Sequence, residues 1–336
     1  MADPKLRWGI LSTGRIGIKA LLPAIRESQN GVVAAIASRD LKTAQDAAKA
    51  NGIPRAFGSY DALLESPDID AVYIPLPNSL HKDWTIRAAE RGKHVLCEKP
   101  FALNASEVDE MIAAAKQHRV LLMEAFMYRF HPQFAQVQEL IARGAIGAVQ
   151  IIRCAFCFYL DNLDNIRLKK DLGGGALMDV GCYCVNMARG IAGAEPLEVR
   201  ADAVIGETSQ VDETLTAILR FPKGIVAHFD ASFRTDYREW LDIQGSEGRI
   251  ELPRPIKPQS AGGGEFFLYH GEDCETIVTP FANHYQLMVE HFADAVMHGT
   301  PLRYPPELDR ANMRVIDALY ESARTGQTVN LPANLR

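Results

Sequence analysis

The stretch RWGILSTGRIG, residues 7–17, decides the fold of the first part of the chain. Its apolar start predicts a strand, its middle predicts a glycine turn, and the segment GIKALLPAIRES, which begins at residue 17, predicts a helix. The turn matches the pattern G-x-G-x-x-G of dinucleotide-binding sheets, except that Ser12 stands in place of the first glycine. Gly14 lets a pyrophosphate approach the backbone, and Gly17 lets the helix pack against the strand.

The helix that follows this turn has free backbone N–H groups and a partial positive charge at its start, both of which favour phosphate binding. Ser12 weakens the match to the pattern but adds a hydroxyl near a phosphate. The alternative interpretation is a plain turn between a strand and a helix. The strand–turn–helix setting favours a cofactor site, and the turn residues expected to bind the cofactor are Ser12, Thr13, Gly14, Arg15, Ile16 and Gly17.

The end of the next strand, VVAAIAS at residues 32–38, is expected to select the cofactor. An acidic residue about 20 positions after the glycines would bind the ribose 2′-hydroxyl of NAD. Here the strand ends in Ser38 and Arg39, which offer a hydroxyl and a guanidinium fork matched to a 2′-phosphate. NADP(H) is therefore the expected cofactor. Asp40, if turned inward, would restore NAD(H) binding, so NAD(H) stays open as the weaker cofactor.

Strands and helices alternate up to about residue 126. Apolar segments such as DAVYIPLP (residues 70–77) and HVLCEKP (residues 94–100) predict strands, and SLHKDWTIRAAERG (residues 79–92) predicts one of the helices between them. Strands this apolar, separated by helices, indicate a parallel sheet that is covered on both faces. We therefore expect a doubly wound Rossmann domain of the α/β class over residues 1–126, which binds the dinucleotide.

Beyond residue 127 the pattern becomes rich in strands. AVQIIRCAFCFYL (residues 148–160) and GIVAHFDASFR (residues 224–234) are typical of the segments that predict a largely antiparallel sheet, whereas HYQLMVEHFADAVMHG (residues 284–299) predicts a helix. No clear linker separates the two parts. We expect residues 127–336 to form a second, α+β domain that binds the substrate.

Bulk properties narrow the function classes. The 336 residues are 47% hydrophobic and 23% charged, which is typical of a packed globular protein. The net charge of -6 argues against a nucleic-acid partner. No apolar run approaches the roughly 20 residues that a membrane span needs. The first residues lack the pattern of a signal peptide, so we expect a cytoplasmic protein without a membrane partner.

The cysteine pattern predicts neither a metal site nor a disulfide. Cys154 and Cys157 form a C-x-x-C pair, but they lie in a predicted strand, where residues three apart face opposite sides. No second C-x-x-C completes a zinc set. Buried thiols are the favoured interpretation of this pair.

Hydride transfer to or from a hydroxyl group needs a side chain that handles the proton. The pattern Y-x-x-x-K is absent, and no zinc ligand set can be assembled. Lys99 closes the strand HVLCEKP at its carboxyl end, the edge where open α/β sheets bind ligands. There its charge favours deprotonation of a substrate hydroxyl or of a neighbouring tyrosine. The alternative is a surface lysine at the end of a strand.

A second cluster of candidates is GGGALMDVGCY, residues 173–183. Its glycines allow a backbone to approach a ligand closely. Asp179 and Tyr183 are four residues apart, so on a helix they share a face. Tyr183 can relay a proton, and Asp179 can orient the substrate or the tyrosine. The alternative is a capped helix that carries a half-buried tyrosine.

These motifs together resemble the Gfo/Idh/MocA family of oxidoreductases over almost the whole chain. The resemblance depends on the glycine turn, PNSLH at 77–81, CEKP at 97–100, EAFMYRFHP at 124–132 and GGGALMDVGCYC at 173–184, in this order. It implies a Rossmann domain followed by an open-faced mixed sheet, through which members often form homodimers or dimers of dimers.

The resemblance also implies roles for individual residues. Lys99 matches the catalytic lysine of the family. Tyr183 stands where many members have histidine, a form similar to the branch of glucose–fructose oxidoreductase, dimeric dihydrodiol dehydrogenase and NADP-dependent D-xylose dehydrogenase. The residues implied along the nicotinamide half of the cofactor are Pro75, Leu76, Asn78 and His81. Glu98 and Lys99 are also expected to bind the cofactor, and the residues expected at the substrate are Arg129, Arg167, Asp179 and Tyr183. His81 as a simple helix-start residue and the arginines as solvated side chains remain alternatives.

The resulting hypothesis is an NADP(H)-dependent oxidoreductase that moves a hydride between nicotinamide and a sugar-like hydroxyl or carbonyl. Oxidation at C1 of an aldose, as in a D-xylose 1-dehydrogenase, would give a lactone, with Tyr183 polarised by Lys99 to accept the hydroxyl proton. Two enzymatic alternatives are a reductase of a keto-sugar or of 1,5-anhydrofructose and a trans-dihydrodiol dehydrogenase. An alternative of another class is a sensor that binds NADP without catalysis.

Overall fold

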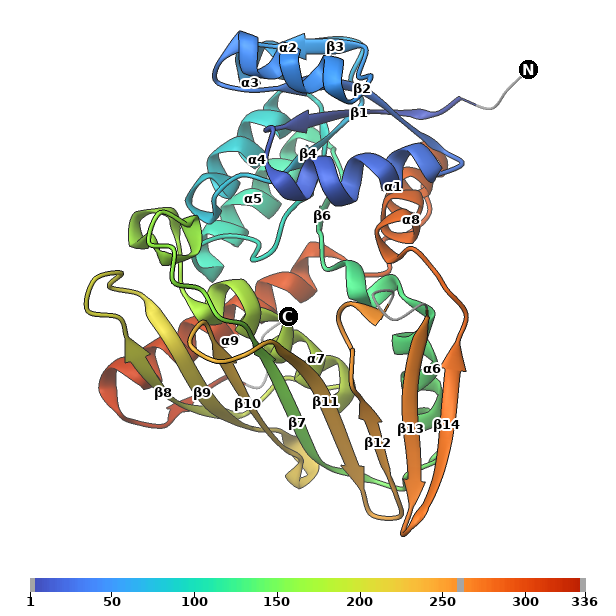
Figure 1. Cartoon of the computed structure of the whole chain (residues 1–336), viewed down its shortest axis with the longest axis vertical. Coiled ribbons are helices and arrows are strands. Elements are labelled where there is room, and N and C mark those ends of the chain that lie inside the picture. The colour runs from blue at the N-terminus through green and yellow to red at the C-terminus, as the bar shows by residue number, and fades with distance from the viewer. Residues whose placement is uncertain (1–3, 259–262, 333–336) are drawn as a thin grey trace. The chain divides into compact units, whose positions relative to one another are not determined.

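The computed structural model describes residues 4–258 and 263–332 (Figure 1). Its contacts divide the chain into two compact units. The first comprises Met1–Met127 and Asn283–Arg310, and the second comprises Tyr128–Ala282 and Ala311–Arg336. No helix in the described ranges has both the length and the apolar character needed to cross a bilayer.

The first unit is built on a parallel sheet with strand order β3-β2-β1-β4-β5-β6. The strands are β1 Leu6–Leu11, β2 Gly31–Ala37, β3 Arg55–Phe57, β4 Ala71–Ile74, β5 His94–Cys97 and β6 Leu122–Glu124. The chain runs outward from β1 to β3, returns to β4 beside β1, and then runs outward in the other direction. The order therefore reverses between β1 and β4, which is where open α/β sheets bind ligands. This confirms the expected Rossmann sheet.

Helical segments between the strands, and one helix from later in the sequence, complete the first unit. They are a π-helical turn Gly17–Leu21 that continues into α1 Leu22–Glu27, α2 Leu41–Ala50, α3 Tyr60–Leu64, a 3₁₀ turn Asn78–Leu80 that continues into α4 His81–Glu90, α5 Ala105–His118 and α8 His284–His298. Asp40, Ser59 and Asn104 cap α2, α3 and α5 by accepting a hydrogen bond from a backbone N–H of the first turn. These residue types are the preferred ones at helix starts, because their side-chain oxygens satisfy free N–H groups.

Helix α8 belongs to the first unit, although the division expected at residue 126 assigns it to the second part. It lies against α1 (Figure 1). Phe292 of α8 is fully buried against Trp8, with ring centroids 5.4 Å apart. The side chain of Asn30 also donates to the Asp294 carboxylate at 2.7 Å and to the Glu290 carbonyl at 2.9 Å. The apolar face of α8 thus completes the core beside β1 and β2.

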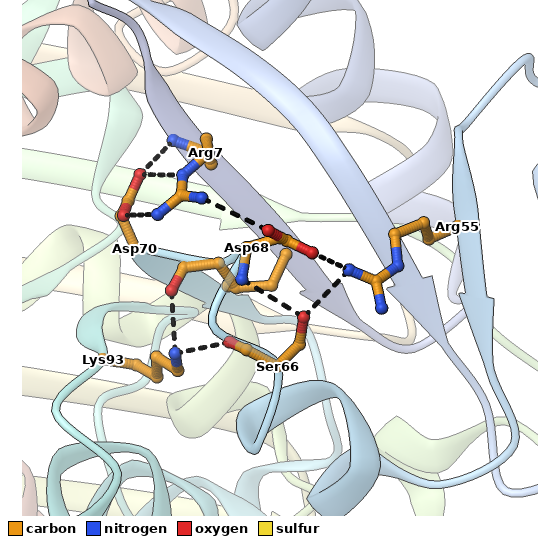
Figure 2. Close-up of polar contacts among 7 residues, drawn as sticks. Arg7, Arg55, Ser66, Asp68, Asp70 and Lys93 are labelled. Atoms are coloured by element: carbon orange, nitrogen blue, oxygen red, sulfur yellow. Dashed lines mark hydrogen bonds and ion pairs between the residues drawn. The ribbon is translucent and has the colours of Figure 1, made fainter.

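The amino-terminal ends of the strands are held by a polar network (Figure 2). Arg7 donates to both carboxylate oxygens of Asp70, at 2.9 and 2.6 Å, and also lies 3.7 Å from Asp68. Asp68 in turn contacts Arg55. The ammonium of Lys93, a buried residue, donates to the carbonyl oxygens of Ser66 and Ile69 at 2.7 and 2.8 Å. These charges satisfy one another or the backbone, so this end of the sheet is structural.

The second unit contains a mixed sheet with strand order β14-β13-β12-β11-β7-β10-β9-β8-β15. The strands are β7 Val149–Cys157, β8 Glu198–Ile205, β9 Asp212–Arg220, β10 Val226–Ser232, β11 Arg238–Gly245, β12 Arg249–Leu252, β13 Gly264–His270, β14 Asp273–Thr279 and β15 Val329–Asn330. Strands β7 and β10 pair in parallel, and the other neighbouring strands of this sheet pair antiparallel. The expectation of a largely antiparallel sheet is therefore confirmed.

The second unit also contains helical segments, several of which contact the sheet. They include a 3₁₀ turn Met127–Phe130, α6 Pro132–Ala142, short 3₁₀ turns Ile166–Leu168, Lys170–Leu172 and Pro222–Gly224, a π-helical turn Leu177–Gly181, α7 Cys182–Ala192 and the part of α9 (Pro306–Thr325) from Ala311 onward. The π-helical turn and α7 contact β7 and β10. Leu215 and Leu219 of β9 are buried beneath them, whereas Ile218 on the opposite face is 46% exposed. That opposite face is the open one.

Candidate functional site

The glycine turn lies where the strand order of the first unit reverses. A side chain at Gly17 would meet Ile10 of β1 and the ring of Pro75 at 3.2 and 3.4 Å, and one at Gly14 would lie 3.5 Å from the Pro75 carbonyl. The absent side chains therefore let the first helix pack closely on β1 and on the loop after β4. The turn, which is expected at the pyrophosphate, and Pro75, which is expected along the nicotinamide half of the cofactor, therefore lie side by side.

Ser12 occupies the first glycine position at a structural cost. Its φ of 151° is a conformation that favours glycine. Its hydroxyl oxygen accepts a hydrogen bond from the Gly14 N–H at 2.9 Å, and it also lies within reach of the Tyr60 phenol. The hydroxyl thus stabilises the turn itself, a role different from the phosphate contact that the sequence suggests.

The residues expected to select the cofactor follow β2. Ser38 is half-buried and Arg39 is exposed, and the charge of Arg39 reaches the Tyr60 phenol. Asp40 caps α2: one of its carboxylate oxygens accepts from the Thr43 N–H at 2.8 Å and from the Thr43 hydroxyl at 2.6 Å. These bonds hold the pKa of the Asp40 carboxyl below its usual value. The carboxylate is therefore engaged in the helix cap instead of being turned toward a ribose.

His81 connects two of the predicted cofactor segments from within the core. It is fully buried at the start of α4, and its ring nitrogens lie 2.9 Å from the carbonyl oxygens of Pro100 and Leu76. Burial lowers the pKa of the imidazole. His81 therefore holds the loop after β4 to the turn after β5, in addition to starting α4. Its place along the cofactor stays a prediction. Leu76 is buried, and Asn78 begins the 3₁₀ turn that leads into this helix.

Lys99 follows β5, the strand next to β4, at the carboxyl edge of the sheet. Glu98 fixes the turn that carries Lys99. One carboxylate oxygen of Glu98 accepts from the Tyr73 hydroxyl at 2.5 Å, and the other accepts from the Lys99 N–H at 3.2 Å. The Glu98 N–H donates to the Ile74 carbonyl of the neighbouring strand at 3.1 Å. Lys99 is half-buried on this braced turn.

In the second unit, the glycine cluster brings Arg167 and Asp179 together. The Arg167 Nε atom donates to the Asp179 carboxylate at 2.6 Å, and the Arg167 carbonyl accepts from the Gly175 N–H at 2.9 Å. A side chain at Gly174 would lie 2.4 Å from that same carbonyl. The glycines thus permit this close approach, and Arg167 is an ion-paired residue instead of a simply solvated one.

Tyr183 lies on α7 among other aromatic rings. It is 5% exposed, and its ring centroid lies 5.9 Å from that of Tyr128 and 5.6 Å from that of Phe156. The helix that carries Asp179 and Tyr183 differs from the expected regular α-helix, because its first turn, Leu177–Gly181, is π-helical. Such turns often occur at functional sites.

Arg129 is 5% exposed in the 3₁₀ turn before α6, so the alternative of a solvated arginine is wrong for this residue. Nothing in the geometry of the second unit assigns it a ligand. Its place at the substrate stays a prediction.

Several supporting residues have no signal in the sequence. Tyr60 and Tyr73 reach the glycine turn and Glu98 from α3 and β4. Asp212, at the start of β9, accepts a hydrogen bond from the Leu177 N–H at 2.6 Å. Their partners are 25 to 48 positions away, and no local pattern indicates them.

The six cysteines are free thiols, and five of them are buried, including Cys154 and Cys157. Burial raises the pKa of both of these thiols. Within residues 4–258 and 263–332, no group of three or more histidine, cysteine, aspartate or glutamate side chains is arranged to hold a metal ion.

Comparisons with known proteins identify related chains. The family described as "Oxidoreductase family, NAD-binding Rossmann fold" (Gfo/Idh/MocA) matches residues 6–126, and the Gfo/Idh/MocA C-terminal domain matches residues 134–251. A D-xylose 1-dehydrogenase (NADP⁺) of Haloferax volcanii is 41% identical over 329 residues, 97% of this chain and 100% of that protein. A trans-1,2-dihydrobenzene-1,2-diol dehydrogenase of Xenopus laevis is 39% identical over 253 residues, 74% of this chain and 75% of that protein.

A solved structure is similar over both units. It is a 3-ketoreductase of Actinomadura kijaniata in complex with NADP and TDP-benzene, with a TM-score of 0.91 and 31% identity over 95% of this chain and 98% of that one. Structures of the same enzyme include variants in which one tyrosine is replaced by phenylalanine, or one lysine by alanine or glutamate.

Proposed function

Because the chain belongs to the Gfo/Idh/MocA family of oxidoreductases, we propose that it is an NADP(H)-dependent enzyme that oxidises or reduces a sugar or sugar-like substrate, as an aldose 1-dehydrogenase of the D-xylose type. The observation that carries the proposal is the convergence of the glycine turn, Pro75 and the Glu98-braced Lys99 turn at the carboxyl edge of one sheet. The full-length likeness to an NADP⁺-dependent D-xylose dehydrogenase supports the choice of reaction.

The residues at this edge fit NADP(H). A side chain at Gly14 would lie 3.2 Å from the Ser12 hydroxyl, and its absence leaves the backbone of the turn accessible to a pyrophosphate, whereas Gly17 lets the first helix pack on β1. Arg39 is exposed beside the turn and supplies a fork for a 2′-phosphate, while Asp40 is engaged in its helix cap. When bound, the cofactor supplies the acceptor or donor of the hydride. NAD(H) remains the expected weaker cofactor.

We assign the proton chemistry to Lys99 and Tyr183. They are 84 positions apart in this chain, and the lysine and tyrosine exchanged in the solved ketoreductase variants are also 84 positions apart. In the oxidative direction the substrate hydroxyl loses its proton to the Tyr183 phenolate, and its carbon gives up a hydride. The positive charge of Lys99 favours both the phenolate and the developing alkoxide. Asp179, fixed by Arg167, orients the substrate.

Three alternatives remain open. Reduction of a keto-sugar runs the same chemistry in reverse, and the related 3-ketoreductase favours it; a dihydrodiol substrate is favoured by the Xenopus relative. A sensor that binds NADP without catalysis has no use for a proton relay, so the presence of Lys99, Asp179 and Tyr183 weighs against it.

A substrate panel tests the proposal. Pentoses, hexoses, inositols and trans-dihydrodiols are supplied with NADP⁺ and separately with NAD⁺, and keto-sugars with NADPH, while the absorbance of the reduced cofactor is followed. We expect turnover of an aldopentose, with NADP⁺ preferred. If no compound of the panel is turned over with either cofactor, and NADP nevertheless binds tightly, the result would instead support the sensor.

The open face of the second sheet is the surface proposed for a homodimer. Ile218 and Val204 are 46% and 64% exposed and lie on the same side of neighbouring strands. The mass in solution, measured by light scattering, decides between a single chain and a dimer. A cytoplasmic location also stays a prediction.

A further inference from the structure

The start of the helix that carries Asp179 and Tyr183 is capped by a residue from another strand. Asp212, the first residue of β9, is 2% exposed, and its Oδ2 atom accepts from the Leu177 N–H at 2.6 Å. The first N–H groups of any helix lack partners within the helix, and a carboxylate there interacts favourably with the helix dipole. Such caps usually come from the residue just before the helix; this one is 35 positions away.

A second side chain completes the cap from α9. The Tyr320 hydroxyl donates to the Oδ1 atom of Asp212 at 2.9 Å, and the Met178 N–H faces the phenol oxygen. Helix α9 also holds the next turn, because the Asn312 amide donates to the Cys182 carbonyl at 3.3 Å. The N–H groups of Leu177 and Met178, which are neighbours in one helical turn, therefore face the side chains of Asp212 and Tyr320. Both side chains are far from this turn in the sequence.

The glycine cluster contains a residue that this cap requires. Gly175 has a φ of 128°, and a side chain there would lie 2.1 Å from the Asp212 Oδ1 atom and 2.9 Å from the Tyr320 hydroxyl. Glycine is thus needed at this position both for its conformation and for the space. The glycines are expected from the sequence to let the backbone approach a ligand, whereas Gly175 makes room for the Asp212 carboxylate of the protein itself.

The buried carboxylate costs folding free energy at neutral pH. Burial raises the pKa of Asp212 to about 6, against the opposing effects of the Leu177 N–H and the Tyr320 hydroxyl. A carboxyl whose pKa is higher in the folded state loses its contribution to stability as the pH rises from its ordinary value of 3.8 through about 6. Residues kept against such a cost often serve function instead of stability.

We propose that Asp212 is a positioning residue: with Tyr320 it holds the first turn of the helix that carries Asp179 and Tyr183 in the geometry that the reaction needs. The inference rests on the proposed function, because it gives those two residues their chemical roles. The titratable groups that face the carboxylate are the Tyr320 phenol of α9 and, next to that phenol, the Cys182 thiol of α7. Glu213, the next residue of β9, is paired with Arg234.

The test compares Asp212→Asn and Asp212→Ala with Asp202→Asn, the same change at an exposed position of the neighbouring strand β8. Asparagine can accept one of the two hydrogen bonds, whereas alanine accepts neither. We expect kcat to fall about 10-fold in Asp212→Asn and about 100-fold in Asp212→Ala, since small misplacements of reacting groups have effects of this size. The KM for NADP should stay within about two-fold, because the cofactor residues belong to the first unit.

Two further measurements separate positioning from a merely structural role. The melting temperature of Asp212→Asn at pH 7.5 should equal or exceed that of the wild type, and the difference should vanish near pH 4, where the wild-type carboxyl is protonated. The wild-type kcat should decline as the pH falls through about 6, and Asp212→Asn should lack that decline. Tyr320→Phe, which keeps the ring, should lower kcat less than Asp212→Ala.

The outcomes distinguish this inference from the proposed function. If Tyr183→Phe loses activity while both Asp212 variants keep the wild-type kcat and pH profile, the positioning role is wrong and the proposed function stands. If Tyr183→Phe remains active, the proposed proton acceptor is wrong, whatever the Asp212 variants do. A destabilised Asp212→Asn with unchanged kcat per folded molecule would make Asp212 purely structural.

Discussion

Strand β5 of the first unit has a lysine near each end, and the two lysines have different surroundings. Lys93, before the strand, is buried, and its ammonium donates to two backbone carbonyls within the polar network of Figure 2. Lys99, after the strand, stands on a turn that Glu98 braces beside the reversal of the strand order. One residue type thus serves stability at the amino end of a parallel sheet and, in our proposal, chemistry at its carboxyl end.

The difference follows from the geometry of a parallel sheet. At the reversal point the connections after adjacent strands leave in opposite directions, so loops diverge at the carboxyl edge and leave room for a ligand. At the amino edge of this sheet, Arg7, Asp68, Asp70 and Lys93 have partners from neighbouring loops and strands. These interactions assign the charges of the amino edge to the stability of the fold.

The largest difference between the two ends of β5 is expected when each lysine is replaced by methionine. Lys99→Met should lower kcat about 10³-fold, within the usual range for a lost proton-handling group. Its unfolding midpoint in urea should match the wild type. Steady-state kinetics and denaturation of the same preparation measure both quantities.

Lys93→Met is the matched control. It should leave kcat within about two-fold and lower the free energy of unfolding by about 1–2 kcal/mol, because the carbonyl oxygens of Ser66 and Ile69 lose their donor. Activity that survives in Lys99→Met would remove Lys99 from the mechanism. A large loss of kcat in folded Lys93→Met would contradict the assignment of the amino end of the sheet to stability and of its carboxyl end to chemistry.

Arg39→Ala tests the expected contact with the 2′-phosphate at the carboxyl edge of the sheet. Removal of a charge-assisted contact to the 2′-phosphate should reduce the ratio of kcat/KM for NADP over NAD about 10- to 100-fold, since such bonds contribute about 1.5–3 kcal/mol. Arg87→Ala, which removes an exposed arginine paired with Asp61, should leave the ratio unchanged. A wild-type enzyme that clearly prefers NAD would refute the assignment of Arg39.

Asp70→Asn should have the smallest effect. Burial opposes the charge of Asp70, but the hydrogen bonds from Arg7 hold the pKa of its carboxyl below the ordinary value. The pair is partly exposed, so its loss should cost only about 1 kcal/mol of unfolding free energy at pH 7. A group with a lowered pKa stabilises the fold above its ordinary value, so the deficit should disappear below about pH 4. Urea denaturation at both pH values measures this, and kcat should not change.

The sequence predicts best those features that local chemistry determines. The glycine turn and the end of β5 at Lys99 each depend on residues within one turn or strand, and their patterns are visible in the chain. The family resemblance adds Tyr183 and the open sheet. Division of the chain at residue 126 is close to the first boundary of the compact units, which falls after Met127.

Features that depend on distant partners could not be predicted in this way. The pattern of residues 284–299 indicates a helix but not which sheet it covers. The apolar face of a helix has the same sequence pattern whichever sheet buries it. Asp212 looks like an ordinary acid at the start of a strand; only the pairing of β9 with β10 and the packing of the helix on that pair bring it to Leu177. The π-helical turn, with its altered spacing, also has no local signature here.

The placement of α8 has a consequence for biosynthesis. On the ribosome, residues 1–127 emerge first, yet Phe292, which fills the core beside Trp8, is translated more than 160 residues later. An apolar surface of the nascent first sheet therefore stays uncovered while strands β7 to β14 of the mixed sheet are synthesised. Chaperone demand during translation should be greatest in that interval, and a fragment that stops at Met127 would lack the helix that closes its own core.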